Sequence, residues 1–373
     1  MDRLPLPIVK HVILPDLLLV SLITTQPSTA IRFVGFCTFA FLCLTSVSFT
    51  TGNATQDYFV GFLSASQVLL AVDLLWLIVP LDALRHERDM VLPRDMPLWR
   101  RAYWAFCLNH SVRAIGWTHQ VNNVPPHPRE PRWLFVRSRL IRTVCNFLVA
   151  DVANTYILHM AGTDINSWQT YALPVRCSTI TAWICLTCGT LNAQYYSLSA
   201  MSVGLGMSLP RDWPDLFGKW TDAYTLRKFW GKVWHQNFRR LFTPVGKFIA
   251  RIFGFKRGTN ASSYTQLYTA FFLSSLIHGA GDLMVDRKYA GSSIPFFISQ
   301  AVAITAEDTV IALCRSVAVS SSRLTRLVGY IWVFVWATLT FSMYRDLAVE
   351  AGWGWSSEWP FSPAGLLWKA FHD

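Results

Sequence analysis

Apolar runs of membrane-spanning length recur along this chain of 373 residues. A helix needs about 20 apolar residues to cross the hydrocarbon core of a bilayer. The runs therefore predict an all-α, polytopic integral membrane protein with about eight transmembrane helices. The first run is short and is interrupted by Pro15 and Asp16. The predicted spans are about 11–26, 31–50, 58–80, 141–162, 176–200, 263–283, 293–314 and 327–347.

The composition excludes an ordinary soluble domain. Only 15% of the residues are charged and 52% are apolar, whereas soluble domains carry about 25% charged residues. The 17 Trp and 25 Phe suit lipid-facing helices and the aromatic belts at membrane interfaces. No internal repeat divides the sequence, so that we expect one domain over residues 1–373.

The net charge of +11 is concentrated in two polar stretches and does not indicate nucleic-acid binding. Residues 81–131 hold seven Arg and Lys, and residues 208–262 hold eleven, of 33 in the chain. Cytosolic loops of membrane proteins carry such an excess. We therefore predict that both stretches are cytosolic and that both termini are lumenal. The loops 51–57 and 163–169, which have no Arg or Lys, then also face the lumen.

The eight Cys are scattered through apolar segments and lack the spacing of a metal site. We interpret them as small core residues and expect no metal. The sequence also has no Gly-rich phosphate loop, no nucleophile elbow and no acidic cluster of the kind that binds magnesium diphosphate.

His278 lies inside the apolar run TQLYTAFFLSSLIHGAGDLMV, residues 265–285. An ionisable residue within a membrane helix is costly and usually has a role, and histidine is suited to moving protons near neutral pH. At helical spacing, Ser274, Ser275 and Asp282 share its face. A carboxylate one turn away can orient an imidazole base, which makes Asp282 a candidate partner. A purely structural histidine, satisfied by a neighbouring helix, is the alternative.

A second histidine, His235, closes the aromatic and basic segment FWGKVWHQNFRR. If residues 228–241 form one helix, Lys228, Lys232, His235 and Arg239 lie on one side of it. The other side would be apolar, with Trp230, Trp234, Phe238 and Leu241. This pattern predicts an interfacial amphipathic helix. Either it only anchors a loop on anionic lipid, or its cations face a phosphate-rich ligand and His235 points into a cavity.

Glu307 and Asp308 are adjacent acids inside the predicted span 293–314. Two such acids cannot both face lipid. They meet cations on another helix or line a cavity. A structural role, a proton relay in a transporter and the acid of a membrane-bound terpene cyclase all stay open at this point.

Four segments together resemble the membrane-bound O-acyltransferase superfamily. They are LFGKWTDAYTLRKFWGKVWHQNFRR (216–240), LSSLIHGAGD (273–282), FISQAVAITAEDTV (297–310) and RAIGWTHQVNNVPP (113–126). The resemblance is strongest over about 113–310. Within the superfamily it is to the wax-synthase-like branch, and there to fungal acetyltransferases of terpenoid and meroterpenoid pathways.

The resemblance implies an enzyme with His278 as the catalytic base. His235 corresponds to a second polar residue, which is Asn in many members and His or Asp in others. The resemblance also implies an acyl-CoA donor that enters from the cytosol, an acceptor alcohol that enters from the membrane, and residence in the endoplasmic reticulum. Base catalysis on the alcohol and an oxyanion donor from His235 then give a coherent direct transfer.

The function expected from this resemblance is transfer of an acetyl or other short acyl group from acyl-CoA, with acetyl-CoA as the co-substrate. The acceptor is a hydroxyl of a lipophilic terpenoid or meroterpenoid, and membrane lipid is the other partner. A long-chain wax-ester synthase of the same fold and a proton-coupled transporter are the alternatives. The residues expected to bind the donor are Lys228, Trp230, Lys232, Trp234, Arg239 and Arg240.

Overall fold

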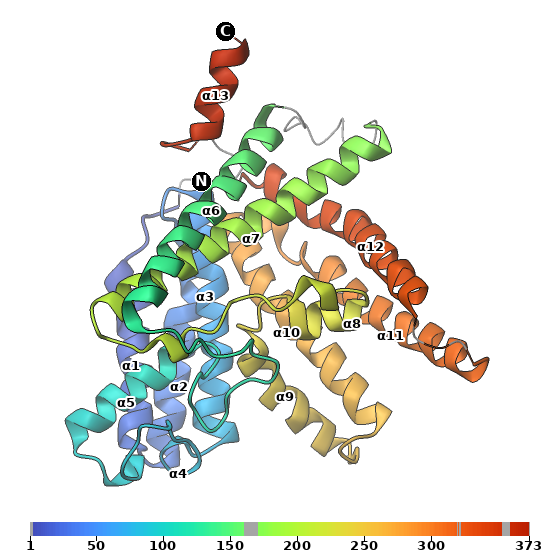
Figure 1. Cartoon of the computed structure of the whole chain (residues 1–373). Coiled ribbons are helices and arrows are strands. Elements are labelled where there is room, and N and C mark those ends of the chain that lie inside the picture. Colours follow the sequence, from blue (N-terminus) through green and yellow to red (C-terminus); the bar gives the residue numbers. More distant parts are fainter. Residues whose placement is uncertain (1–2, 160–170, 319, 321, 353–358, 373) are drawn as a thin grey trace. The chain divides into compact units, whose positions relative to one another are not determined.

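The computed structural model describes residues 3–159, 171–318, 320, 322–352 and 359–372, and within these it contains helices and no strand (Figure 1). The chain divides into two compact units, each built from two separate segments. Unit 1 comprises Met1–Asn122 and Gln236–Ala318, and unit 2 comprises Asn123–His235 and Val319–Asp373. Because the segments alternate along the chain, no single sequence boundary separates the units.

Unit 1 contains helices at five of the predicted spans, and it adds α5 and α9 from the polar stretches. Helix α1 continues from a π-helical turn, η1, and α3 ends in a second one, η3. The bounds are η1 (Val9–Ile13), α1 (Leu14–Thr25), α2 (Thr29–Leu44), η2 (Thr45–Ser48), α3 (Ala54–Val72), η3 (Asp73–Leu77), α4 (Pro80–Ala83), η4 (Pro93–Asp95), α5 (Leu98–His110), α9 (Arg239–Ile252), α10 (Asn260–Val285), η9 (Arg287–Tyr289) and α11 (Ile294–Ser316).

The polar interruption of the first span is accommodated without a break. Pro15 lies where the π-helical turn η1 passes into α1, and because it has no N–H the helical ladder lacks one hydrogen bond there. Asp16 accepts a hydrogen bond of 2.6 Å from Nδ2 of Asn109 on α5. Helical backbone therefore runs from Val9 to Thr25.

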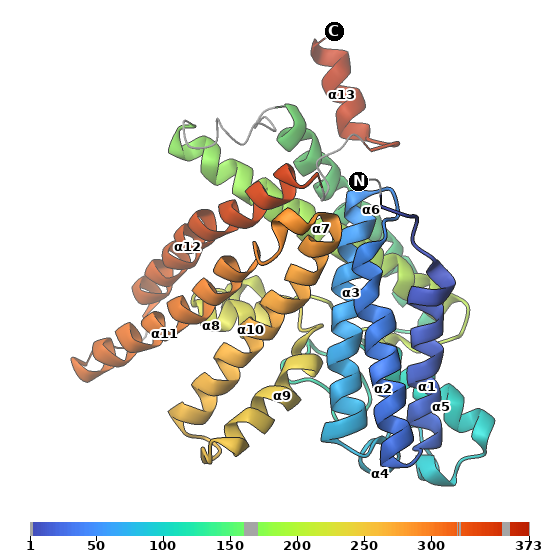
Figure 2. The same ribbon diagram turned by 180° about the vertical axis from the view of Figure 1, so that it is seen from behind.

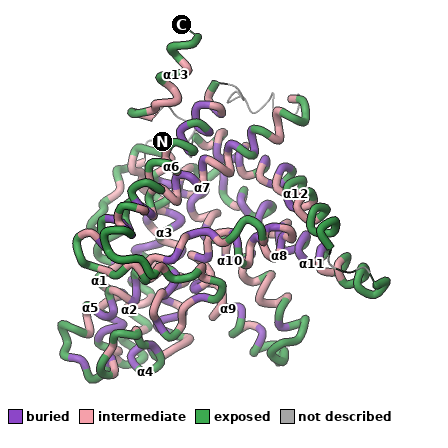
Figure 3. The backbone as a smooth tube through the Cα atoms, viewed as in Figure 1, coloured by how far each residue is buried: buried purple, intermediate pink, exposed green. Residues whose placement is uncertain are grey.

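Apolar side chains of α1, α2, α3, η3 and α5 form the main core of unit 1. Leu19, Ile23, Phe39, Leu74 and Leu108 are each at most 1% exposed. The helices α1, α2 and α3 run side by side (Figures 1 and 2), and buried residues recur along the backbone (Figure 3). This bundle is the frame on which α10 packs through α3.

Contacts within unit 1 show which connecting segments lie at the same end of its helices. At one end, Arg3 bonds Asp57 and the carbonyl of Val285. At the other end, Arg240 donates to the carbonyl oxygen of Leu108. The predicted topology puts three segments on the same side of the membrane: the residues before the first span, the loop 51–57 and the residues after the span 263–283. The contacts of Arg3 bring these three segments together in unit 1.

Unit 2 is built on the pairing of two long helices, α6 and α7, which lie side by side in both views (Figures 1 and 2). Gly189 permits their approach, since a Cβ there would lie 2.8 Å from the carbonyl oxygen of Asn146. The predicted lumenal loop 163–169 lies outside the described residues. The bounds are α6 (Arg132–His159), α7 (Leu173–Gly204), η6 (Pro210–Asp212), η7 (Trp220–Asp222), α8 (Leu226–Lys228), η8 (Phe229–Val233), α12 (Arg323–Glu350) and α13 (Pro363–His372).

Each of the eight predicted spans overlaps a helix of the described residues. Four segments are long and apolar enough to cross a membrane by length and composition: Thr29–Ser48, Ala54–Leu77, Arg287–Ser316 and Arg323–Glu350. For the helices α1, α6, α7 and α10, the crossing stays a prediction.

The sidedness of unit 1 is testable by labelling single cysteines in a cysteine-free background. Asp95→Cys and Phe255→Cys replace exposed residues of the two basic stretches, and we expect both to react with an impermeant maleimide in intact microsomes. Ser292→Cys, in the connection from α10 to α11, should react only after the membrane is opened. Protection of positions 95 and 255 in intact microsomes would overturn the assignment.

Candidate active site

His278 lies in the second half of α10 and is enclosed by aromatic side chains from α3 and α11. Its Nδ1 is 2.5 Å from the hydroxyl oxygen of Tyr58. The Phe297 ring stacks on the imidazole at a centroid distance of 4.4 Å, and the Phe62 ring lies at 4.8 Å. The imidazole is thus oriented by one hydrogen bond and by two phenyl rings.

Two glycines bring α3 close enough to α10 for this contact. A Cβ on Gly61 would lie 2.4 Å from the carbonyl oxygen of Ala280, and one on Gly281 would lie 2.8 Å from ring atoms of Tyr58. Small residues at a helix contact allow such backbone approach in membrane proteins. The phenol of Tyr58, only 4% of whose surface is exposed, therefore reaches a histidine 220 positions away.

Asp282, the partner of His278 expected from helical spacing, is hydrogen-bonded to Ser293 in the structure. Its Oδ2 accepts hydrogen bonds from the hydroxyl and, at 3.2 Å, from the backbone N–H of Ser293. The described hydrogen bond at Nδ1 of His278 is shared with the Tyr58 hydroxyl instead. Ser275 is buried and bonds the carbonyl oxygen of Phe272. Asp282 therefore fixes the turn between α10 and α11 in the described structure.

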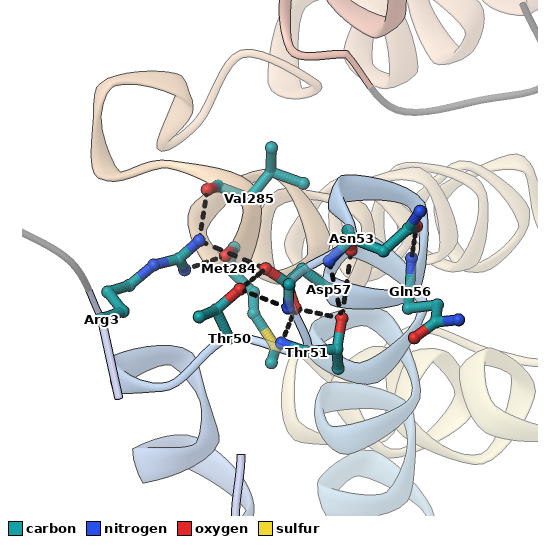
Figure 4. A network of polar contacts seen from close by, with 9 residues as sticks. Arg3, Thr50, Thr51, Asn53, Gln56, Asp57, Met284 and Val285 are labelled. Atoms are coloured by element: carbon teal, nitrogen blue, oxygen red, sulfur yellow. Dashed lines mark hydrogen bonds and ion pairs between the residues drawn. The ribbon is translucent and has the colours of Figure 1, made fainter. Parts of the chain in front are cut away.

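A polar network joins the start of α3 to the end of α10 (Figure 4). Asp57 accepts hydrogen bonds from Thr50 Oγ1 at 2.6 Å and from Thr51 N at 2.5 Å, and Arg3 Nη2 lies 3.2 Å away. The Arg3 guanidinium also donates to the backbone carbonyl oxygens of Met284 and, at 2.8 Å, Val285. Asp57 precedes Tyr58 in sequence, so that this network holds both elements of the His278 site.

The prediction of one amphipathic helix over residues 228–241 is wrong. Helix α8 passes into the π-helix η8, which ends at Val233 because Trp234 adopts an extended conformation with ψ 146°. The next helix, α9, begins at Arg239. Lys228, Lys232, His235 and Arg239 therefore do not form a single stripe. The break also coincides with the boundary between units, since His235 ends a segment of unit 2.

Aromatic rings surround the segment that ends at His235. Its ring lies 5.3 Å from Trp234 and 5.9 Å from Phe217. The Trp230 ring stacks on Phe341 of α12 at 6.5 Å. Gly218 fixes the position of this segment, because a Cβ there would lie 2.2 Å from the carbonyl oxygen of Lys232. Unit 2 thus holds His235, Trp230 and Trp234 in one aromatic cluster, and His278 belongs to unit 1.

Two cations meet at Tyr224, in the same part of unit 2. The Lys228 ammonium is hydrogen-bonded to the Tyr224 hydroxyl and lies 3.7 Å from the ring centroid. Arg326 of α12 lies 5.5 Å from the same centroid. The hydrogen bond from Lys228 lowers the pKa of Tyr224. Lys232 is exposed nearby in sequence. This arrangement suits an anionic group.

Arg239 and Arg240, in unit 1, differ in what they contact. Arg239 donates to Oε1 of Gln236 at 2.9 Å, and burial lowers the pKa of its guanidinium. Arg240 is 4% exposed and donates to the carbonyl oxygens of Leu108 and Ser111, at the end of α5. Burial lowers the Arg240 pKa to about 10, against the opposing effect of Asp73. In the described structure, Arg240 joins α9 to α5.

Sequence reasoning missed Tyr58 and Arg326. Tyr58 stands at the edge of a predicted span, and nothing at helical spacing connects it to His278. Arg326 belongs to the first turn of α12, about 100 positions after the basic segment. The acid Asp308 accepts a hydrogen bond from the Tyr264 hydroxyl at 3.1 Å.

Comparison with known proteins identifies the family of this chain. Residues 213–299 match the membrane bound O-acyl transferase family, and this segment includes both His235 and His278. Acetyltransferase eriL of Hericium erinaceus is 32% identical over 333 residues, which cover 85% of each chain. Acetyltransferase ple2 of Rhodocybe pseudopiperita is 32% identical over 304 residues, 77% of each chain. No solved structure matches the chain.

A helical membrane protein with a half-buried, aromatically enclosed histidine is thus similar over most of its length to named acetyltransferases. The chain belongs to the membrane-bound O-acyl transferase family. It is an acetyltransferase enzyme, as the resemblance predicted.

Proposed function

We propose that the protein transfers an acetyl group from acetyl-CoA to a hydroxyl of a lipophilic terpenoid or meroterpenoid secondary metabolite. We place it in the endoplasmic reticulum membrane, with its basic loops in the cytosol. The supporting observation is His278, whose imidazole is held by Tyr58 and stacked on Phe297 within the family-matched segment.

His278 is the proposed general base. It takes the proton of the acceptor hydroxyl as the oxygen attacks the thioester carbonyl carbon. A new C–O bond forms, the C–S bond of the tetrahedral intermediate then breaks, and the imidazolium returns the proton to the leaving CoA sulfur. The products are an acetate ester and CoA. Positioned base catalysis of this kind contributes about 10²–10⁴-fold, and no step requires an acyl-enzyme.

His235 is proposed to donate a hydrogen bond to the oxyanion of the intermediate. This role rests on its place at the end of the family-matched aromatic segment. A neutral N–H donor meets the requirement. His235→Asn should therefore retain more kcat than His235→Ala, because an amide also supplies such a donor. Equal losses in purified, monodisperse variants would remove the oxyanion role from His235.

The donor site is proposed to lie on the α8–η8 segment of unit 2. Lys228, Lys232 and Arg326 supply cations for CoA phosphates, and Trp230 or Trp234 offers a face for adenine. Among the residues first assigned to the donor, Arg239 stays a proposed phosphate contact. Arg240 is proposed as a structural residue instead, because its buried guanidinium donates to backbone carbonyls.

We expect Lys232→Ala to raise the KM for acetyl-CoA by about threefold to tenfold, since one charged contact is lost. The KM for the acceptor alcohol should not change. Lys256→Ala removes an exposed cation from the α9–α10 loop and is the matched control, with no effect on either constant. Steady-state kinetics with both substrates varied are the measurement. A similar rise for both substrates in the Lys232 variant would assign this cation to the fold or the lipid surface.

The function as a whole is tested with purified protein, labelled acetyl-CoA and a panel of terpenoid and meroterpenoid alcohols. The expected product is a labelled acetate ester. Palmitoyl-CoA and a fatty alcohol form the second arm, because a wax-ester synthase would prefer them. Turnover in that arm alone would replace the proposed donor and acceptor, and absence of transfer in both arms would refute the proposal.

A further inference from the structure

The hydrogen bond between Tyr58 and His278 decides which imidazole nitrogen can act as a base. A neutral imidazole has one N–H and one nitrogen with a free lone pair. A phenol can either donate to that lone pair or accept the N–H. Nδ1 is 2.5 Å from the Tyr58 oxygen and takes part in one of these two arrangements. If Tyr58 donates to Nδ1, Nε2 carries the N–H. If Tyr58 accepts the Nδ1–H, Nε2 has the free lone pair.

We propose that Tyr58 is a positioning residue that accepts the Nδ1–H of His278, so that Nε2 is the atom that takes the proton of the acceptor alcohol. This inference rests on the proposed role of His278 as the base. During transfer the proton goes from the alcohol oxygen to Nε2 and then to the leaving sulfur, and Nδ1 keeps its own proton throughout. The phenolic oxygen faces the N–H of the imidazolium that forms, which is the role of an orienting partner in catalytic triads.

The packing around Tyr58 makes the contact rigid. Its ring lies against α10 where Gly281 offers no side chain. The imidazole cannot turn freely, because Phe297 stacks on it with an interplanar angle of 26° and Phe62 lies 4.8 Å away. A ring held on two sides keeps Nδ1 toward α3, which is where Tyr58 stands.

The polar network of Arg3 and Asp57 joins the first turn of α3 to the last turn of α10 (Figure 4). These are the two helices that carry Tyr58 and His278. Asp57 is 2% exposed and ties the first turn of α3 to Thr50 and Thr51. Arg3 connects that carboxylate to the last carbonyls of α10. The segment before the first span therefore takes part in holding Tyr58 against His278.

The tautomer is measured directly by solid-state NMR on the full-length protein with 15N-labelled histidine, reconstituted in lipid. A His278→Gln sample identifies the His278 signals by difference. We expect the Nδ1–H tautomer in the unmodified protein and a shift toward Nε2–H in Tyr58→Phe. The Nε2–H tautomer in the unmodified protein would overturn the inference, and this result does not depend on how well the variant folds.

Kinetics supply the second readout. Tyr58→Phe keeps the ring and removes the hydroxyl, and we expect kcat to fall by about tenfold, the size of one lost hydrogen bond. The KM for acetyl-CoA should stay near its normal value. Tyr268→Phe removes from α10 a hydroxyl that bonds Thr305 and should leave kcat unchanged.

The two proposals fail separately. An unchanged kcat in Tyr58→Phe, with His278→Ala inactive, would refute the positioning role and leave the base intact. Normal turnover in His278→Ala would refute the proposed mechanism itself.

Discussion

His278→Ala is expected to lower kcat by about 10²-fold or more, because positioned base catalysis is worth that much. The protein should remain folded, since the imidazole is not part of the interhelical glycine contacts. Donor binding should be preserved, because the residues proposed to bind acetyl-CoA lie on other elements. Turnover and acetyl-CoA binding are measured separately on purified, monodisperse protein.

His372→Ala is the control for this substitution. It removes another histidine, which is exposed on α13, and it should not change kcat. Added imidazole should restore part of the kcat of His278→Ala, because the space between Phe62 and Phe297 becomes vacant. A variant at position 278 that turns over near the normal rate would show that the base is another group.

Gly281→Ala is expected to destabilise the protein by about 1–3 kcal/mol, the usual cost of overpacking. The new methyl group would lie 2.8 Å from the Tyr58 ring and 2.9 Å from the Tyr58 carbonyl oxygen. Since backbone is involved, α3 and α10 have to separate. We expect a lower Tm in detergent and a lower kcat at temperatures where the variant is still folded, because Tyr58 moves away from His278.

Gly279→Ala is the matched control, two positions away on the same helix. A Cβ at Gly279 meets nothing within 4 Å, and Ala favours a helix over Gly. Its Tm should be unchanged or slightly higher. The two variants are thus predicted to differ in sign, and a normal Tm for Gly281→Ala would contradict the close approach of α3 and α10.

The network at the start of α3 connects the N-terminal segment to the active-site helices. Arg3 is the third residue of the chain, and it bonds both Asp57 and the end of α10. A substitution of Arg3 is therefore expected to weaken the contact between α3 and α10, and with it the position of Tyr58 beside His278. The carboxylate of Asp57 would then lose its only cationic partner among the described ion pairs.

Much of the helical layout was predictable from the sequence because membrane spans are determined locally. Each helix satisfies its own backbone hydrogen bonds, and apolar length alone marks it. Each of the eight predicted spans overlaps a helix of the described residues. His278 was also recognisable alone, since a histidine in an apolar run is unusual whatever surrounds it. The quoted motifs then indicated the family, which the comparison confirmed.

Helical spacing did not predict which side chains share a face where the backbone leaves the helical conformation. The stripe expected over 228–241 assumed one continuous helix, and the extended conformation at Trp234 divides it. Residue types in that segment give no sign of the break. Gly218, whose close contact with Lys232 fixes the segment, stands 14 positions earlier than Lys232 in the chain. Tertiary packing determined this local structure.

The sequence by itself determined where the long apolar helices lie, which histidine stands in one of them and to which family the chain belongs. Only the tertiary structure decided the partners of that histidine. Spacing along α10 placed Asp282 on the same face, yet its carboxylate bonds Ser293. His278 shares its described hydrogen bond with the Tyr58 hydroxyl, 220 positions away. The physical reason is that a helix fixes only its own faces, whereas the contact between α3 and α10 depends on Gly61 and Gly281, each of which lets the other helix approach.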